Sequence, residues 1–407
     1  MTEVRFVILG GGMVAGYAAK EMGDRGLKPG ELLIVSADTF LPYERPPLSK
    51  SFLAGKDTED AIRIEPQEFY NNIGVKVMLG TEAAGVDARR KRLRLKNGSE
   101  IAFEKLLIAT GARPRTLEIP GAGLRHVHYL RSLDDSKAIR SSADSALHAV
   151  VIGGGFIAME TAAVLAQRRI EVTMVLREDR VWKQFFTPEM SAFFERYVTE
   201  RGVKLAKNSQ VRELRGDGMV REAVLQDGAV IPCAVVVAGI GVTPATEVLA
   251  DSGIALANGV AVNEYLETSA PDIYAAGDVA EYQDVLYGKR RRVEHWDNAV
   301  AQGRHAARVM MGEREPFRHV PYFFSDVFDL SYEYWGDAAE ADEAAHRGEM
   351  SSNSFSVWWL RQGRVTAAFV MNRSEEERDT AARWVEARQA VSAERLKSAT
   401  FLTEARA

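Results

Sequence analysis

The sequence has very little cysteine, which excludes several kinds of chemistry. Cys233 is the single cysteine among 407 residues. One thiol cannot form a disulfide within the chain, a Cys-x-x-Cys redox pair or a metal cluster held by thiolates. Its place on an expected strand before Ala238 and Gly239 fits no peroxidatic role either. We therefore expect no metal site.

Long apolar runs and an excess of positive charge are also missing. No apolar run approaches the roughly 18 residues of a membrane-spanning helix. Residues 1–9 lead straight into an apolar segment without the features of a signal peptide. The net charge is −5, whereas duplex nucleic acid requires a basic surface. We expect no membrane span, no nucleic-acid ligand and a cytoplasmic location.

The composition that is present is typical of a globular protein. Apolar residues make up 46% and charged residues 27% of the chain, which excludes a disordered or fibrous protein. At about 150 residues per domain, the length indicates two or three domains.

Two segments share one pattern: an apolar strand, a glycine-rich turn and a helix that starts with small residues. They begin at Val4 and His148. Their turns fit G-x-G-x-x-A, with Gly10, Gly12 and Ala15 in the first and Gly153, Gly155 and Ala158 in the second. In this pattern the glycines let the backbone approach a pyrophosphate, which binds at the helix N-terminus. Two copies predict two dinucleotide sites, and flavin with nicotinamide is the first pairing to consider because it moves electrons.

Each half also contains a second apolar strand that ends at glycine. One is residues 105–109, followed by Thr110 and Gly111, and the other is residues 235–238, followed by Gly239 and Gly241. We expect these strands to return beside the glycine turns in two doubly wound units. A third strand, at residues 273–276, ends in Gly277 and Asp278. The Asp278 carboxylate would bind a polyol chain or cap a helix.

Other elements follow from periodicity and composition. Helices are expected at residues 188–200 and 297–311, with strands around Lys76, Leu93 and Glu222. From residue 320 the chain is rich in aromatic residues, which indicates a separate sheet domain closed by a helix at 375–388. The polar tail after Val391 is expected to fray. The expected fold class is α/β, with two Rossmann-like doubly wound domains and a C-terminal α+β interface domain.

These residues resemble the flavoprotein pyridine nucleotide-disulfide reductase superfamily without its disulfide, in its ferredoxin reductase and monodehydroascorbate reductase branch. The motifs that carry the resemblance are the two glycine turns, the string Pro-Tyr-Glu-Arg-Pro-Pro-Leu-Ser-Lys at 42–50, and residues 109–111, 129–135, 277–278 and 293–296. The family architecture implies a split FAD domain at 1–114 and 245–318. It also implies an NAD(P)H domain at 115–244 and an interface domain at 319–407.

The resemblance also implies two sets of cofactor-binding residues. The FAD set is Gly10, Gly12, Ala15, Asp38, Arg45, Lys50, Ala109, Thr110, Gly111, Arg131, Gly277, Asp278, Glu294, His295, Trp296 and Phe324. The NAD(P)H set is Gly153, Gly155, Phe156, Ile157, Glu160, Arg177, Glu178, Gly239 and Gly241.

The resemblance assigns the catalytic role to Lys50 and Glu160. In this family the equivalent lysine lies near flavin N5 and the equivalent glutamate near the nicotinamide, a charge-assisted contact that orients the ring. Simpler interpretations remain: an acid suits the first turns of any helix, and Lys50 could be solvated.

The residues expected at the two adenosine riboses depart from the family. Ala37 stands where family members often have Glu, and Asp38 is the possible substitute. In the second half, Arg177 and Glu178 are neighbours. Arg177 could hold an NADP 2′-phosphate and Glu178 an NAD ribose, so both NADH and NADPH stay open, with NADH slightly favoured.

The residues expected near the electron acceptor depart from the monodehydroascorbate reductases. Phe324 stands where they carry Tyr, and Val300 where they carry Arg. A site without that Arg and hydroxyl is poorly suited to a small acidic radical. Phe324 and Trp296 would lie against the exposed side of the flavin, or would be core aromatics.

The leading hypothesis is an FAD-dependent NAD(P)H oxidoreductase that takes a hydride onto flavin N5 and passes single electrons to a ferredoxin-type iron-sulfur protein. The alternatives are a monodehydroascorbate or quinone reductase and a redox sensor resembling apoptosis-inducing factor. The basic run Lys289, Arg290, Arg291 and Arg292 is either a solvated loop or a docking patch for an acidic partner. The oligomeric state, monomer or dimer, stays open.

Overall fold

The computed structural model describes residues 2–398, which divide into two compact units. The first contains residues 2–45, 58–113 and 242–319, and the second contains residues 46–57, 114–241 and 320–398. Each unit is therefore assembled from segments that are far apart in the sequence. The division into three domains stays a prediction.

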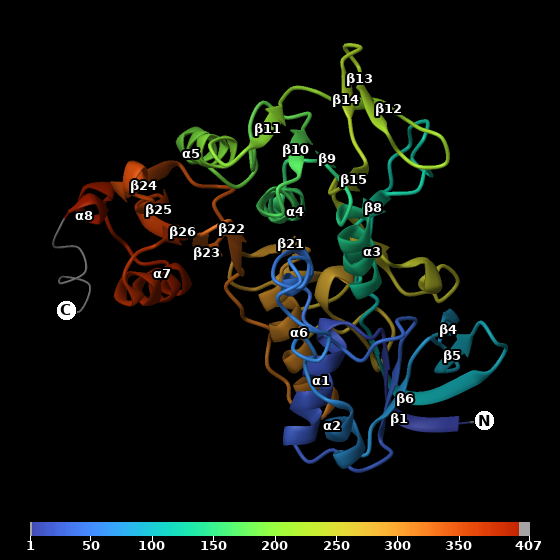
Figure 1. Cartoon of the computed structure of the whole chain (residues 1–407). Helices are drawn as coiled ribbons and strands as arrows, with labels where there is room; N and C mark the ends of the chain where they lie inside the picture. Colours follow the sequence, from blue (N-terminus) through green and yellow to red (C-terminus); the bar gives the residue numbers. More distant parts are fainter. Residues whose placement is uncertain (1, 399–407) are drawn as a thin grey trace. The chain divides into compact units, whose positions relative to one another are not determined.

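A seven-stranded sheet forms the centre of the first unit (Figure 1). Its order is β3-β2-β1-β6-β5-β4, with β19 paired to β6. The strands are β1 (Thr2–Leu9), β2 (Leu32–Val35), β3 (Lys76–Met78), β4 (Ala83–Asp87), β5 (Arg92–Leu95), β6 (Glu100–Ile108) and β19 (Ile273–Ala275). Since β1, β2, β6 and β19 are parallel, their carboxyl ends meet at one edge, where doubly wound sheets bind ligands.

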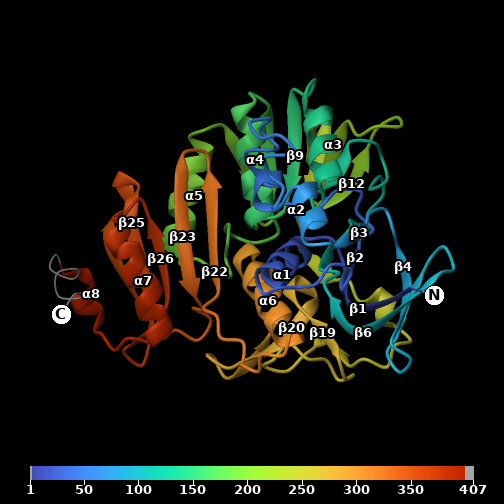
Figure 2. The same cartoon turned by 90° about the horizontal axis from the view of Figure 1, so that it is seen from below.

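The helices of the first unit are α1 (Met13–Asp24), α2 (Gln67–Asn72) and α6 (Trp296–Met310). α1 and α6 lie side by side in both views (Figures 1 and 2). Glycine permits this approach, because a Cβ on Gly303 would lie 2.8 Å from the carbonyl oxygen of Val14. The remaining elements are β7 (Ala112–Pro114), β16 (Val242–Pro244), β17 (Leu256–Ala257), β18 (Gly259–Ala261), β20 (Ala280–Asp284), β21 (Lys289–Arg291), η2 (Glu247–Leu249) and η3 (Gly277–Val279).

The second unit contains a five-stranded parallel sheet of order β11-β10-β9-β15-β8. Its valine-rich central strands are buried, as expected for a parallel sheet covered on both faces. The strands are β8 (Val127–Tyr129), β9 (His148–Ile152), β10 (Glu171–Val175), β11 (Val203–Ala206) and β15 (Val235–Ala238). The helices are α3 (Leu133–Ala143), α4 (Phe156–Gln167) and α5 (Pro188–Thr199). A small sheet contains β12 (Val211–Arg215), β13 (Glu222–Leu225) and β14 (Val230–Pro232), and η1 (Pro46–Ser49) also belongs to this unit.

A second, antiparallel sheet in this unit has the order β22-β23-β26-β25-β24. Its strands are β22 (Tyr322–Val327), β23 (Leu330–Gly336), β24 (Glu343–Glu349), β25 (Ser354–Arg361) and β26 (Arg364–Met371), and η4 (Met350–Ser352) follows β24. Helix α7 (Glu375–Ala387) packs along this sheet, with α8 (Ala393–Lys397) after it (Figure 2). Ser374 caps α7, whose first turn contains three glutamates, because acidic groups and a hydroxyl cap stabilise a helix N-terminus.

The expected fold class is confirmed. The two glycine turns, the return strands and both long helices occur where the sequence predicts them. Two expectations are wrong. Residues 289–291 form strand β21 and not a loop, and part of the tail forms α8, in which Leu396 is fully buried. Residues 399–407 lie outside the described part of the chain. Among the described residues, no helix is long and apolar enough to cross a membrane.

Candidate active site

The first glycine turn joins β1 to α1 in the first unit. Gly10 has φ = +126°, and a Cβ there would lie 2.1 Å from the carbonyl oxygen of Ala109, so only glycine fits. Gly12 is the N-cap of α1 and provides no side-chain cap, which leaves the first-turn N–H groups for a ligand. A Cβ on Gly12 would lie 3.5 Å from the Arg45 guanidinium. Backbone donors beside a guanidinium fit the pyrophosphate of a dinucleotide.

The second glycine turn joins β9 to α4 in the second unit with the same geometry. Gly153 also has φ = +126°, and its Cβ would lie 2.2 Å from the carbonyl oxygen of Gly239. Gly155 caps α4 without a side chain. No described atom of this unit lies within 4 Å of a Cβ on Gly155. The turn therefore also fits a pyrophosphate, with more open space beside it.

The residues after β10 show how the second turn could recognise a nucleotide. Glu178 faces the turn, because its Oε2 lies 3.9 Å from a Cβ built on Gly154. Arg177 is mostly exposed, and its Nε lies 2.7 Å from the other oxygen, Oε1, of Glu178. The carboxylate is thus directed at the turn, and the guanidinium is held by the carboxylate.

Asp38 occupies the matching place after β2. Its carboxylate accepts hydrogen bonds from the backbone N–H of Phe40 at 3.1 Å and from the Tyr43 hydroxyl at 3.0 Å. The side chain is half-buried. Local bonds therefore engage both oxygens, and its role at a ribose stays a proposal.

Several residues expected around the flavin gather in the first unit at the end of β19. The Gly277 N–H donates to Oε1 of the buried Gln302 at 2.7 Å. Asp278 is buried within η3 rather than placed at a helix N-cap. His295 is half-buried, and desolvation lowers its pKa to about 4, so its imidazole is neutral at pH 7. This cluster provides a buried carboxylate and neutral donors or acceptors, as a polyol chain requires.

Glu44 belongs to the same unit, and sequence reasoning assigned it no role. Its carboxylate accepts hydrogen bonds from the indole of Trp296 and from the hydroxyl of Tyr17. The two donors come from α6 and α1. Glu44 therefore orients Trp296. Its position within the motif at residues 42–50 could have indicated a role for Glu44 from the sequence.

Lys50 and Glu160 lie together in the second unit. Lys50 Nζ is 2.8 Å from Glu160 Oε1, and Glu160 is 4% exposed. The hydroxyls of Ser325 and Ser49 donate to Oε1 and Oε2, each at 2.5 Å. The hydroxyl of Ser136 fixes the segment that carries Ser49 and Lys50 by donating to the Leu48 carbonyl at 2.8 Å. An ammonium and two hydroxyls together compensate the burial of this carboxylate. The sequence predicted the pair but neither serine.

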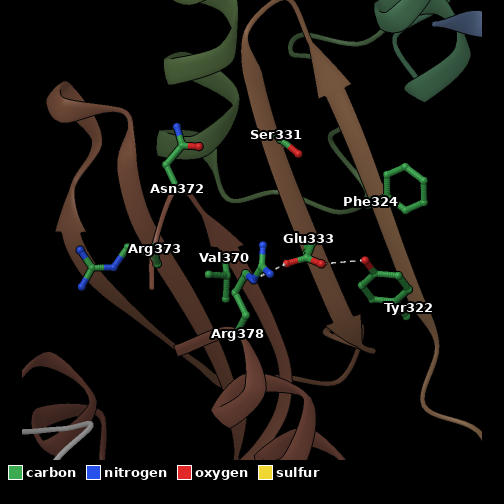
Figure 3. Close-up of a pocket in the computed structure, with 8 residues that line it drawn as sticks. All are labelled: Tyr322, Phe324, Ser331, Glu333, Val370, Asn372, Arg373 and Arg378. Atoms are coloured by element: carbon green, nitrogen blue, oxygen red, sulfur yellow. Dashed lines mark hydrogen bonds and ion pairs between the residues drawn. The ribbon is translucent and has the colours of Figure 1, made fainter. Parts of the chain in front are cut away.

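Phe324 lies on β22 next to Lys50, whose Nζ is 5.6 Å from the ring centroid, within cation–π range. Phe324 also lines an open pocket of about 410 Å³ on the C-terminal sheet (Figure 3). In that pocket Glu333 accepts a hydrogen bond from Tyr322 at 2.8 Å and pairs with Arg378 at 3.2 Å (Figure 3). Phe324 is thus half-buried and accessible from this side.

Of the remaining NAD(P)H residues, Phe156 and Ile157 begin α4, and Gly241 follows β15. Phe156 contacts the ring of Phe323 at 4.7 Å between centroids. Ile157, one residue further, is 40% exposed. Gly241 has φ = +99°, and its carbonyl accepts a hydrogen bond from the N–H of Arg115 at 2.9 Å.

Hydrogen bonds within their own units hold Thr110, Gly111 and Arg131 in place. The Thr110 hydroxyl donates to the Ala245 carbonyl at 2.7 Å, and Ala245 N–H donates to the Gly111 carbonyl at 2.9 Å. The N–H of Arg131 donates to Asp135 at the start of α3, in the second unit.

The three arginines of the basic run at 289–292 are ion-paired within the first unit, and docking of an acidic partner at this run stays a prediction. Arg290 pairs with Glu281 at 3.2 Å, and Arg291 pairs with the buried Asp284 at 3.0 Å. Arg292 is 9% exposed and pairs with Glu294. Carboxylates of the same unit offset these charges, so the run does not act as an unpaired cationic surface.

Two further positions behave as core residues. Val300 is buried in α6, where it takes part in packing and offers no polar group. Cys233 is buried, and burial raises the pKa of its thiol to about 12, which leaves it protonated and unreactive.

Two glycine turns that each require glycine lie at the carboxyl ends of parallel strands. Together with the Lys50 pair of the buried Glu160, they define an oxidoreductase that binds two dinucleotides. The chain belongs to the pyridine nucleotide-disulphide oxidoreductase family, whose model matches residues 4–303, and residues 322–404 match the reductase C-terminal family. The family uses FAD and NAD(P)H.

Known proteins of two kinds are similar to the chain. It is 36% identical over 411 residues to "Monodehydroascorbate reductase 4, peroxisomal" of Arabidopsis thaliana, covering 95% of this chain and 83% of that protein. It is also 36% identical over 374 residues to the "5,5'-dehydrodivanillate O-demethylase ferredoxin reductase subunit" of Sphingobium sp., covering 91% and 90%. A chain of the covalent putidaredoxin reductase–putidaredoxin complex matches with a TM-score of 0.95 and 29% identity over the full length of both chains.

Proposed function

We propose that the chain is an FAD-dependent NADH oxidoreductase that passes electrons to a ferredoxin-type iron-sulfur protein. The observation that carries this proposal is the buried Glu160, held by Lys50 and two serines at the start of the helix that follows the second glycine turn. Bound FAD would supply hydride acceptance and one-electron release. The chain's residues would hold both dinucleotides and fix their orientation.

FAD would bind at the first glycine turn. Arg45 and the N-terminal N–H groups of α1 would hold its pyrophosphate. The buried Asp278 carboxylate would accept hydrogen bonds from the ribityl chain, and Trp296, fixed by Glu44, would lie against the ring system. Arg45, the start of α1, Asp278 and Trp296 all belong to the first unit, which supports a single FAD site there.

The nicotinamide dinucleotide would bind at the second turn. The N-terminus of α4 would hold its pyrophosphate, and Glu160 would orient the nicotinamide while Lys50 holds the carboxylate in place. NADH is favoured because the Glu178 carboxylate faces the turn and Arg177 is already bound to it. A carboxylate accepts hydrogen bonds from a ribose diol and repels a 2′-phosphate.

An iron-sulfur protein is the favoured acceptor. The ferredoxin reductase subunit and the putidaredoxin reductase complex are named for such partners. Phe324 carries no hydroxyl, and Val300 is a buried apolar residue, so neither provides the polar contacts that a small acidic radical needs. The similarity to monodehydroascorbate reductase keeps that radical as the second candidate.

A cytoplasmic location agrees with the single buried thiol.

Stopped-flow spectroscopy tests both halves of this proposal. Flavin reduction is measured with NADH and NADPH, and the reduced enzyme is then mixed with ferredoxin, ascorbate radical or the artificial acceptor ferricyanide. Fast reduction by NADH and fast oxidation by ferredoxin support the proposal. Turnover with ascorbate radical alone would establish the second candidate, and slow reduction by both nucleotides would indicate a redox sensor.

Glu160→Gln tests the pair itself. It should slow flavin reduction by about 100-fold, because the nicotinamide loses its orienting carboxylate, while the FAD content stays unchanged. The matched control is Glu333→Gln, which removes another paired carboxylate from the second unit and should leave flavin reduction unaffected. Equal rates in Glu160→Gln and the wild type would remove Glu160 from the mechanism.

A further inference from the structure

Glu160 is held by more than its lysine. Oε1 receives both the Lys50 ammonium and the Ser325 hydroxyl, and Oε2 receives the Ser49 hydroxyl. A lysine on a long flexible stem fixes charge but not the rotation of a carboxylate. Short hydrogen bonds to an ionised group restrict that rotation.

Ser325 reaches Glu160 from the C-terminal sheet. It lies on β22, the edge strand, where alternate residues point to opposite faces. Phe323, Ser325 and Val327 are buried, whereas Tyr322 and Phe324 are half-buried. Ser325 is therefore on the inner face, and Phe324 is on the face that lines the open pocket (Figure 3).

The inner face of β22 contacts the first turns of α4 at two points. Phe323 packs against Phe156 at 4.7 Å, and Ser325 donates to Glu160. Behind Ser325 its cross-strand partner is Tyr332. Burial raises the pKa of Tyr332 well above its usual value, so this neighbour stays uncharged.

We propose that Ser325 is a positioning residue for hydride transfer, acting by orienting the Glu160 carboxylate at the nicotinamide. This rests on the proposed function of Glu160. The C-terminal sheet would then take part in the reductive half-reaction through its inner face, in addition to presenting Phe324 on its outer face.

The test is the rate of flavin reduction by NADH in Ser325→Ala, measured by anaerobic stopped flow. The limiting rate should fall about tenfold, as expected for losing a hydrogen bond to a charged group, with little change in the NADH concentration at half-saturation. Ser325→Cys, which fills the site with a slightly larger thiol that is a weak donor, should behave in the same way and serves if the alanine variant does not fold.

The matched control is Ser356→Ala in the same sheet. Ser356 is fully buried and donates to the buried Glu377 at 2.6 Å, so its loss should cost similar stability. Flavin reduction in Ser356→Ala should equal the wild type, and FAD content should be unchanged in all variants.

A double-mutant cycle separates positioning from packing. In the Glu160→Gln background, Ser325→Ala should cause no further slowing, because its effect passes through the carboxylate. Additive losses, or a wild-type rate in Ser325→Ala while Glu160→Gln is slow, would overturn the inference and leave the role of Glu160 intact. If Glu160→Gln itself reduces normally, the proposed function of Glu160 fails instead.

Discussion

The two glycine turns are the most instructive comparison in the molecule. Gly10 and Gly153 share φ = +126°, and in both a Cβ would collide with the carbonyl oxygen of the residue that follows a neighbouring strand, at 2.1 and 2.2 Å. The helix that follows each turn has a glycine N-cap without a side-chain hydrogen bond. The backbone conformation that suits a pyrophosphate is therefore the same in both units.

The side chains around the two turns differ. A Cβ on Gly12 would lie 3.5 Å from Arg45, and one on Gly11 would lie 2.1 Å from the Ser36 hydroxyl oxygen. At the second turn, the space beside Gly155 is open within its unit, and a carboxylate, Glu178, faces the turn. Under the proposed function, this difference predicts a retained cofactor at the first turn and an exchanging nucleotide at the second, because affinity follows the side chains added to a common backbone site.

The largest effects on the two turns are expected from replacing Gly10 or Gly153 with alanine, which adds a Cβ. Gly10→Ala should give protein without FAD and with low stability, since strain and collision with Ala109 act at the retained cofactor. Gly153→Ala should keep FAD but lose at least about 100-fold in the NADH reduction rate. The absorbance of bound flavin and stopped-flow reduction measure the two effects.

The control for both is Gly123→Ala, where no described atom lies within 4 Å of the new Cβ. It should keep both FAD and the NADH reduction rate. Retention of normal FAD binding in Gly10→Ala would show that the two turns are not specialised as described.

Acidification should destabilise the first unit. Burial lowers the pKa of His295 and of His305 to about 4, below the usual value of about 6.5. The unfolded chain therefore binds protons first. The free energy of unfolding is therefore highest above about pH 6.5. It falls as the pH drops towards 4, by up to about 3 kcal/mol for each histidine.

Thermal unfolding followed by flavin fluorescence from pH 7 to 4 measures this loss. His305→Gln removes one of the two titrating groups and should flatten the pH dependence. The same slope in that variant and in the wild type would assign the acid sensitivity to other groups.

Arg45→Met sharpens the comparison at the first turn. Removing the guanidinium should weaken FAD binding by about tenfold to 100-fold, as expected for charge-assisted contacts to a phosphate, while NADH binding changes little. FAD titration of the apoprotein measures it. Arg113→Gln, a mostly exposed arginine of the same unit paired with Glu247, should show no change.

Glu178→Gln tests the second turn, and its expected effect, on the choice between NADH and NADPH, is the smallest of these predictions. The preference for NADH over NADPH in kcat/KM should fall by about tenfold or less, because the partly exposed charge is screened by solvent. Glu171→Gln at the opposite end of β10, also ion-paired, is the control. An unchanged preference in Glu178→Gln would mean that this carboxylate does not select the ribose.

The fold was predictable from the sequence because its signals are local. Strand, turn and helix at Gly10 and Gly153 need only a few consecutive residues, and the aromatic-rich segment after residue 320 indicated the C-terminal sheet. The ion pairs of the basic run at 289–292 were not predictable from the sequence. Glu281, Asp284 and Glu294 neutralise its arginines, and strand pairing places Arg291 opposite Tyr282, a register that depends on the folded chain.

The sequence by itself determined the two glycine turns and the residue types at the Lys50–Glu160 pair, since backbone conformation and motif strings are properties of short segments. Only the tertiary structure decided that Ser325 and Ser49 share Glu160 with Lys50, and that Glu44 joins Tyr17 to Trp296. These contacts join residues far apart in the chain. Their hydrogen bonds depend on ångström-scale placement, which only the packing of whole elements sets.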